Sequence, residues 1–340
     1  MSLKKLSAQL GLSQTTVSRA LNGYPEVSEA TRERVLQAAA KSNYSPNQRA
    51  VSLATGRAMA VSHVVPIAPR QNVVNPIMAE FIAGASQTYK EMGYELTLTF
   101  TAEEDAEDIY RTLASKRSVD GFVVHSPVRN DPRIKLLNDI GLPFVVNGRV
   151  ADSDESYSWI DVDDKRSFQR ATKLLIDLGH ERIALINGNE ELTYAWHRKL
   201  GYRQALGEVG MEFDESIEFS TPLTETIGYS ITRDLIETGR MPTAMLVSSY
   251  IVALGVRRAL ADHGLRIGND VSVITHDDDL SYFDNAGAFP QFTSTRFSAR
   301  EVGLKGAKML LDLIAKPDKG PQQKLVEAQL IMGSSTSPVS

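Results

Sequence analysis

The spacing of apolar residues near the start of the chain predicts three short helices. Leucines recur at helical spacing over residues 3–10, and Gly11 ends that helix where a left-handed backbone is easiest to adopt. Ser13 and Ser28 are suited to cap a second helix, over residues 14–21, and a third. Two short helices joined by a glycine-containing turn, with a third in support, form the outline of a helix-turn-helix.

Beyond residue 58 the pattern changes to short apolar runs that alternate with amphipathic segments. A helix is expected over residues 75–94, with Gly93 near its end. The β-type runs cover residues 60–67, 95–100, 120–126, 142–148, 182–188, 244–249 and 271–276. Such alternation predicts parallel sheets with crossover helices, and sheets of this class bind ligands beyond the carboxyl ends of their strands.

Composition and charge narrow the class of protein. The 340 residues include no cysteine, which excludes disulfide scaffolds, thiolate zinc sites and cysteine nucleophiles. No apolar run has the length of a signal peptide or a membrane span, so we expect a cytoplasmic protein without a membrane partner. The first 57 residues hold eight basic and three acidic residues, although the whole chain has a net charge of −5. A basic head on an acidic body indicates a module that binds a polyanion.

An enzyme is the alternative class, and its usual motifs are missing from the sequence. There is no Gly-x-Gly-x-x-Gly after a strand, no Walker loop, no Gly-x-Ser-x-Gly and no His-Glu-x-x-His. The run His-Asp-Asp-Asp at 276–279 could bind a metal, but adjacent carboxylates mostly cap turns. We therefore expect no catalytic residue, no metal and no cofactor. A free-standing sugar-binding protein would explain the body but not the basic head.

Three sequence blocks resemble the DNA-binding head of the lactose-repressor (LacI/GalR) family. They are SQTTVSRALN at 13–22, VSEATRERVLQAA at 27–39 and NYSPNQRAVSLATGR at 43–57, in the order and spacing of that family. The resemblance continues through nearly the whole chain. It implies an α/β fold class, with an N-terminal helix-turn-helix head and a two-lobed body that has parallel sheets and is similar to periplasmic binding proteins.

The resemblance also implies domain boundaries. Residues 1–46 are expected to form the DNA-binding domain, 47–57 a hinge helix or linker, and 58–340 the effector-binding and dimerisation domain. The subdomains of the body are expected to be an N-subdomain of about 58–160 and 293–318 and a C-subdomain of about 161–292 and 319–334.

In that family the second helix enters the major groove and the hinge helix docks in the minor groove. Arg19 can donate two hydrogen bonds to guanine, Gln14 can pair with adenine, and the residue that matches Leu53 wedges between base pairs. The expected DNA contacts are Ser13, Gln14, Thr15, Thr16, Ser18, Arg19, Asn22, Asn47, Arg49, Ala50, Leu53 and Arg57. Alternatively, Gln14, Thr15 and Arg19 are solvated helix surface and Leu53 packs against the body.

Matching the family residue by residue places an effector cleft between the lobes. The expected contacts are Ile77, Phe81, His125, Arg149, Asp163, Arg198, Ser249 and Asp277, with Met78, Ser126 and Asn147 beside them. An arginine whose guanidinium is free to face the cleft, together with separated carboxylates, suits a polyhydroxylated ligand. Alternatively, Asp163 caps a helix, Asp277 lies in a turn and His125 packs in a loop.

Departures from the family pattern leave the ligand open. Ser249 and Tyr250 stand where the family usually has Asn-Asp, Thr275 and His276 replace Gly-Phe, and Phe297 replaces a common glutamine. The string THDDDLSYF, together with the hinge sequence, looks most like regulators of α-glucoside utilisation.

The sequence therefore predicts a sequence-specific DNA-binding transcriptional regulator, a repressor of carbohydrate-utilisation genes controlled by a small sugar. Its expected partners are a near-palindromic double-stranded operator and a second copy of the chain, since two heads must reach two half-sites. The last strand-like run is followed only by SSTSPVS, so we expect a dimer and not a tetramer. The alternatives are a sugar-binding protein without a transcriptional role and a regulator that responds to a non-sugar metabolite.

Overall fold

The structure, a computed structural model, divides the chain into two compact units. One unit comprises Met1–Met59 with Arg117–Asp120, and the other comprises Ala60–Lys116 with Gly121–Ser340. We call the helical part of the first unit the head and the second unit the body. The described residues are 2–21, 24–42, 44, 56–66, 76–102, 105–151, 153–283, 285 and 289–339. No helix within these ranges is long and apolar enough to cross a membrane.

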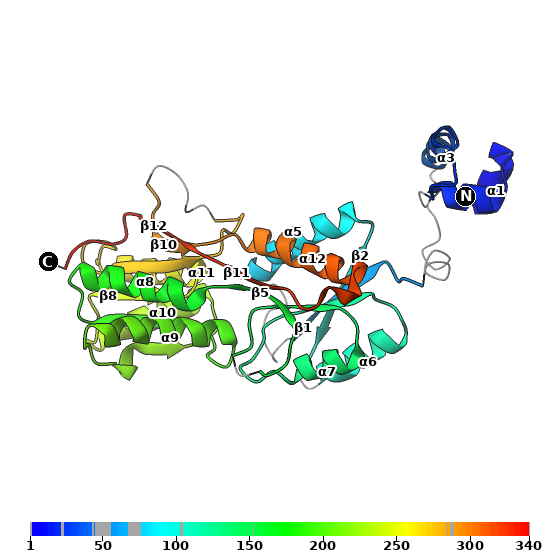
Figure 1. The fold of residues 1–340 in the computed structure, drawn as a ribbon. Helices are drawn as coiled ribbons and strands as arrows, with labels where there is room; N and C mark the ends of the chain where they lie inside the picture. The colour runs from blue at the N-terminus through cyan, green and yellow to red at the C-terminus, as the bar shows by residue number, and fades with distance from the viewer. Residues whose placement is uncertain are drawn as a thin grey trace. The chain divides into compact units, whose positions relative to one another are not determined.

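The described part of the head consists of α1 (Leu3–Leu10), α2 (Gln14–Leu21) and α3 (Glu29–Lys41) (Figure 1). Gly11 ends α1 with a φ of 65°, and the Ser28 side chain accepts a hydrogen bond from the Thr31 amide at the start of α3. The apolar faces of the helices meet in a core of Leu6, Val17, Ala20, Val27, Val35 and Ala39. The predicted helices and both serine caps are thereby confirmed.

The first lobe of the body is built on a parallel sheet with the strand order β11-β5-β4-β3-β1-β2. Its strands are β1 (Ala60–Pro66), β2 (Glu95–Thr101), β3 (Gly121–Val124), β4 (Phe144–Asn147), β5 (Ser158–Val162) and β11 (Gln323–Val326). Its helices are α5 (Pro76–Glu91), α6 (Ala106–Ser115), α7 (Pro132–Ile140), α12 (Ala299–Ala315) and the short η3 (Pro317–Lys319).

The second lobe has a sheet with the order β12-β10-β9-β8-β6-β7, in which only β12 runs antiparallel to its neighbour. Its strands are β6 (Ile183–Asn187), β7 (Glu218–Ser220), β8 (Ala244–Val247), β9 (Ser272–Asp277), β10 (Thr293–Arg296) and β12 (Gln329–Ile331). Its helices are α8 (Asp164–Asp177), α9 (Thr193–Glu208), α10 (Glu225–Glu237), α11 (Tyr250–Asp262) and the short η2 (Glu215–Ile217).

The chain passes from lobe to lobe between β5 and α8, between β10 and α12, and between β11 and β12, and these crossings correct the expected subdomain boundaries. Residues 293–296 were expected in the N-subdomain, but they pair with β9 in the second sheet. Residues 323–326 were expected in the C-subdomain, but they pair with β5 in the first sheet. A short crossover run can extend either sheet, and its apolar pattern does not reveal which strand becomes its neighbour.

Close helix packing in the first lobe depends on two glycines. Helices α5 and α12 lie against each other (Figure 1). A Cβ atom built on Gly303 would lie 2.0 Å from the carbonyl oxygen of Phe81, and one built on Gly84 would lie 1.9 Å from the carbonyl oxygen of Arg300. Because a helix backbone cannot move aside as a flexible side chain can, any larger residue would push the two helices apart.

We expect Gly303→Ala to lower the free energy of unfolding by about 1–3 kcal/mol, since the added methyl group overpacks the contact between α5 and α12. Gly207→Ala in α9 is the matched control, because no atom lies within 4 Å of the added Cβ there. That variant should be neutral or up to about 1 kcal/mol more stable. Urea titrations followed by circular dichroism measure both, and equal midpoints for the two variants would contradict the packing argument.

Candidate DNA interface and effector pocket

One face of α2 carries the side chains expected to read DNA bases. Gln14, Thr15 and Arg19 are exposed, whereas Val17 and Ala20 are buried in the head core. An amide, a hydroxyl and a guanidinium on the exposed face of a short helix can reach base edges in a major groove. The head therefore leaves these three side chains available for the role expected from the sequence.

Ser13 and Thr16 are held together at the start of α2. The Ser13 hydroxyl accepts a hydrogen bond from the Thr16 amide at 3.0 Å and lies 2.8 Å from the Thr16 hydroxyl. Only one hydroxyl proton is used in that contact, which leaves the other for a phosphate oxygen. Ser18 is half-buried and Arg57 is exposed. The remaining expected contacts lie outside the described residues: Asn22, Asn47, Arg49, Ala50 and Leu53.

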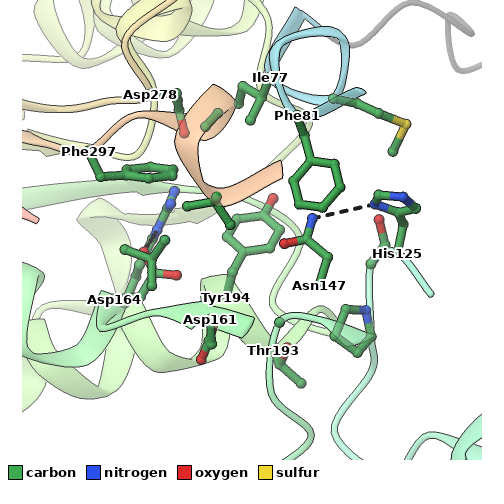
Figure 2. A pocket seen from close by; sticks show the side chains of 18 of the residues that line it. Ile77, Phe81, His125, Asn147, Asp161, Asp164, Thr193, Tyr194, Asp278 and Phe297 are labelled. Carbon is green, nitrogen blue, oxygen red and sulfur yellow. Dashed lines mark hydrogen bonds and ion pairs between the residues drawn. The ribbon is translucent and has the colours of Figure 1, made fainter. Parts of the chain in front are cut away.

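A pocket in the body collects residues from both lobes at the carboxyl ends of their strands (Figure 2). This is the place at which parallel sheets bind ligands. Of the eight residues expected to contact the effector, Ile77, Phe81, His125 and Arg198 line the pocket, as do their expected neighbours Met78, Ser126 and Asn147. The rest of the lining is Pro127, Gly148, Asp161, Val162, Asp164, Thr193, Tyr194, Leu223, Asp278, Phe297, Ala299 and Val302.

Arg198 is buried in the pocket wall and its guanidinium is already engaged, which corrects the expectation that it is free. Its Nε donates to Oδ1 of Asp164 at 2.7 Å, and its Nη1 donates to the carbonyl oxygen of Ser248 at 2.8 Å. The guanidinium carbon lies 4.8 Å from the centre of the Tyr194 ring and 5.2 Å from that of Phe168. Arg198 is thus a part of the protein scaffold as well as of the pocket surface.

Two other pocket carboxyls have a buried oxygen that accepts no hydrogen bond from the described residues. These oxygens are Oδ2 of Asp161 and Oδ2 of Asp278. Burial raises the pKa of Asp161 to about 8, with the nearby Asp164 as a second cause. Burial also raises the pKa of Asp278 to about 7 against the opposing effect of Arg198. Arg149 stands with its Nε 3.5 Å from Oδ2 of Asp161, outside the pocket lining.

The other three residues expected in the cleft have local structural roles. Asp163 accepts a hydrogen bond from the Arg166 amide and caps α8. Ser249 accepts one from the Ile251 amide and caps α11. Asp277 accepts one from the Asp279 amide in the turn after β9. The alternative of a cap for Asp163 is therefore the arrangement observed, whereas Asp277 is the last residue of β9.

The aspartates that line the pocket, Asp161, Asp164 and Asp278, were not predicted from the sequence. The segment Ile-Asp-Val-Asp-Asp holds three of them, and the family match selected the middle one, Asp163. That position directly precedes a helix, where aspartate is a preferred cap. The capping preference was the available signal that Asp163 serves the backbone and that Asp161 and Asp164 remain for the pocket. The run of aspartates after β9 offered no comparable signal for Asp278.

A polar contact joins the two lobes beside the pocket. Glu80 lies on α5 between the pocket residues Ile77 and Phe81, and it is buried. Its carboxylate accepts a hydrogen bond at 3.1 Å from the amide of Ser281, which follows β9 in the second lobe, and it also bonds the Ser281 hydroxyl. Nε of Arg300 donates to the other oxygen at 2.9 Å. The α5 wall of the pocket is therefore tied to the segment that carries Asp278. Within the described ranges, no three histidine, aspartate or glutamate side chains are placed to hold a metal ion.

A helix-turn-helix head and a two-lobed ligand-binding body in one chain define a DNA-binding transcriptional regulator. Residues 3–47 match the bacterial regulatory proteins of the lacI family, and residues 172–336 match a periplasmic binding protein-like domain. The chain is 42% identical over 339 residues to the HTH-type transcriptional regulator AglR of Rhizobium meliloti (strain 1021), covering 99% of this chain and 95% of AglR. The chain belongs to the lacI family of bacterial regulatory proteins.

The transcriptional regulator CelR is similar to this chain both in sequence and in a solved structure. The HTH-type transcriptional regulator CelR of Thermobifida fusca is 31% identical over 335 residues, covering 98% of this chain and 97% of CelR. A solved complex of the transcriptional regulator CelR with cellobiose superposes with a TM-score of 0.71 at 29% identity, covering 98% of this chain and 99% of the other. The fold class expected from the sequence is confirmed, and so is the family.

The buried carboxyl of Asp161 should make stability depend on pH. Burial raises the pKa of Asp161 from its ordinary value of 3.8 to about 8 in the folded chain. Between these two pH values the folded protein therefore holds a proton that the unfolded chain releases. Stability therefore falls as pH rises between these values. The free energy of unfolding of Asp161→Asn, relative to that of the wild type, should therefore rise by at most about 1.4 kcal/mol per pH unit between about pH 5 and 7.

The matched control for this prediction is Asp177→Asn, which changes an exposed aspartate on α8. Urea titrations of the wild type and both variants at pH 5, 6 and 7 measure the difference. A gain for Asp161→Asn that stays constant with pH would contradict the raised pKa.

Proposed function

We propose that this regulator is a repressor of carbohydrate-utilisation genes whose affinity for its operator is controlled by a sugar bound in the pocket. It acts in the cytoplasm as a homodimer on a near-palindromic operator. The proposed effector class is an α-glucoside, on the strength of the THDDDLSYF string and the hinge sequence. The proposal assigns no catalytic role to any residue.

The observation that carries the proposal is a pair of buried carboxyl oxygens, one on Asp161 and one on Asp278, that accept no hydrogen bond from the described residues. A buried acceptor without a hydrogen bond is costly, and a ligand that supplies hydroxyl donors offsets that cost. Phe81 and Phe297 in the same lining offer ring surfaces against which the C–H face of a sugar can pack. A polyhydroxylated ring presents both kinds of surface. An anionic ligand would instead meet the carboxyls of Asp161, Asp164 and Asp278.

The relatives support this class of ligand. The CelR structure holds cellobiose, a disaccharide, and that protein matches this chain from the head through both lobes. The pocket of this chain holds three aspartates and one arginine, Asp161, Asp164, Asp278 and Arg198. The particular sugar is therefore a matter for a ligand screen.

A thermal-shift screen of mono- and disaccharides tests the proposal, because a bound ligand raises the melting temperature by mass action. The screen includes purines and amino acids as non-sugar metabolites. Sugars that raise the melting temperature should also change operator binding in a fluorescence-anisotropy titration. A shift from a non-sugar compound alone, or from none, would contradict a sugar effector.

Asp278→Leu should weaken binding of the sugar found in that screen by about 10- to 100-fold, because hydrogen bonds to a buried carboxyl contribute about 1.5–3 kcal/mol. Operator affinity without sugar should stay close to that of the wild type. Asp279→Asn is the matched control, since Asp279 is adjacent, only half-buried and outside the pocket lining. Isothermal titration calorimetry measures the sugar, and equal losses in both variants would contradict the role of Asp278.

Arg19→Ala should weaken specific operator binding by about 1–3 kcal/mol and relax the preference for one base pair in each half-site. Lys41→Ala is the control, since it removes the same charge from an exposed position at the end of α3. That variant should retain the wild-type consensus in selection from a random DNA pool. If the consensus selected by Arg19→Ala is also unchanged, Arg19 does not read a base.

A further inference from the structure

A chain of hydrogen bonds runs through the interior of the first lobe and ends at the pocket. The hydroxyl of Tyr89 on α5 lies 3.0 Å from Nε2 of His63 in β1. Nδ1 of His63 lies 3.1 Å from Nε2 of His125, which follows β3. Nδ1 of His125 lies 3.4 Å from Nδ2 of Asn147 at the end of β4, and Figure 2 shows this last contact beside the pocket. We call these three residues before Asn147 the relay.

The relay is buried, and this fixes the number of its protons. Tyr89 and His125 are each 1% exposed and His63 is 0% exposed. Burial lowers the pKa of His125 to about 3, with Arg133 as a second cause, and lowers the pKa of His63 well below its usual range. Both rings are therefore neutral. A neutral imidazole has one donor and one acceptor, so each ring passes on the direction of the hydrogen bond that it receives.

The hydroxyl of Tyr89 sets that direction. Among the described residues, its only hydrogen-bond partner is Nε2 of His63. If His63 donated to Tyr89, the buried hydroxyl proton would have no acceptor among the described residues, at a cost of about 1–3 kcal/mol. If Tyr89 donates, only an oxygen lone pair is left over, which is the more readily tolerated case. Tyr89 is therefore the donor, and the proton of His63 is on Nδ1.

The same reasoning carries the direction to Asn147. His63 donates from Nδ1 to Nε2 of His125, so the proton of His125 is on Nδ1 and needs an acceptor. The amide oxygen of Asn147 can accept it, whereas the amide nitrogen cannot. Rotation about the last side-chain bond exchanges the two atoms without moving the rest of the residue. The proton count thus favours the rotamer opposite to the one in Figure 2, with the nitrogen turned toward the pocket.

We propose that the relay fixes Asn147 as a hydrogen-bond donor to the effector. The inference rests on the proposed function, since the pocket must take a polyhydroxylated ligand. Asp161 and Asp278 offer buried oxygens that accept no hydrogen bond from the described residues, whereas Asn147 offers N–H groups. The ligand must therefore place an accepting oxygen at Asn147: a ring oxygen, a glycosidic oxygen or a hydroxyl lone pair. Tyr89 and His63 are positioning residues outside the pocket lining.

The first test needs no ligand and so separates this inference from the proposed function. The full-length protein is labelled with ¹⁵N in its six histidines, and long-range ¹H–¹⁵N spectra report which ring nitrogen of each is protonated. His63 and His125 are recognised by the N–N coupling across their shared hydrogen bond, since no other two histidine rings in the described ranges are bonded to each other. Both should carry the proton on Nδ1. Protonation on Nε2 of either ring would overturn the relay.

The second test uses the sugar with the largest effect in the screen, together with its monodeoxy, monofluoro and carba analogues. Fluorine replaces a hydroxyl as an acceptor but cannot donate. One analogue that lacks an acceptor should bind the wild type about tenfold more weakly. In Asn147→Leu the same analogue and the parent sugar should bind with equal affinity, because the amide that donates to the missing acceptor is gone. If the acceptor is a hydroxyl, its fluoro analogue should keep the wild-type affinity.

The control for the second test is Asn130→Leu, which changes an exposed asparagine outside the pocket lining. It should reproduce the wild-type pattern of analogue affinities. Two results would overturn the proposal. One is a fluoro analogue that, at the sugar position facing Asn147, loses as much affinity as the deoxy analogue. The other is that no analogue loses affinity in a way that depends on Asn147. If no sugar binds at all, the proposed function fails and the tautomer measurement alone decides the direction of the relay.

Discussion

One guanidinium stands among three buried carboxyls in the wall of the pocket, and the chemistry of the site depends on that imbalance. Arg198 pairs with Asp164 and with the carbonyl oxygen of Ser248, so its charge is used within the second lobe. Through these bonds Arg198 joins α9 to α8 and to the residue that follows β8. Breaking a buried ion pair leaves an uncompensated charge, so losing either partner would be costly. Asp161 and Asp278 each keep a buried oxygen that accepts no hydrogen bond from a described residue, although Nε of Arg149 lies 3.5 Å from that of Asp161. The pocket surface is polar because these carboxyl oxygens remain available as hydrogen-bond acceptors.

The first lobe contributes a different kind of wall. Phe81 packs edge-on against His125 and His63, so the aromatic surface of the pocket rests on the same histidines that reach Asn147. These side chains come from α5, from β1 and from the residue after β3, and they fill the interior of the first lobe. Neutral rings can be buried there without a charge partner. The first lobe thus contributes aromatic surface, one amide and the Asp161 carboxyl, and the second lobe contributes Arg198 with the carboxyls of Asp164 and Asp278.

Helix α5 belongs to both parts of this arrangement. Ile77 and Phe81 line the pocket from its first turns, and Glu80 between them bonds Ser281 of the second lobe. The close contact of α5 with α12 at Gly84 and Gly303 leaves little freedom for the helix to shift alone. A ligand that moves α5 relative to Asp278 must therefore act on the contact between the lobes. A change in the relation of the lobes is the kind of two-state element through which a ligand can act at a distance.

Local pattern in the sequence determined the head helices, the caps at Ser13 and Ser28, the strand runs and the edge of the sheets at which the pocket lies. These features depend on the period of apolar residues and on the backbone preferences of a few residues, which neighbours along the chain decide. The family match placed half of the expected cleft residues in the pocket lining, Ile77, Phe81, His125 and Arg198.

Only the tertiary structure decided the sheet membership of residues 293–296 and 323–326, because strand pairing is a choice among partners distant in the sequence. It also decided which aspartates face the pocket. Asp163 and Asp277 accept hydrogen bonds from nearby backbone amides, whereas Asp161 and Asp278 each have a buried oxygen that accepts none from the described residues. The bonds of His63 and of Arg198 join residues at least 26 positions apart. No local pattern encodes such contacts, because each depends on where the sheets and helices bring the partner.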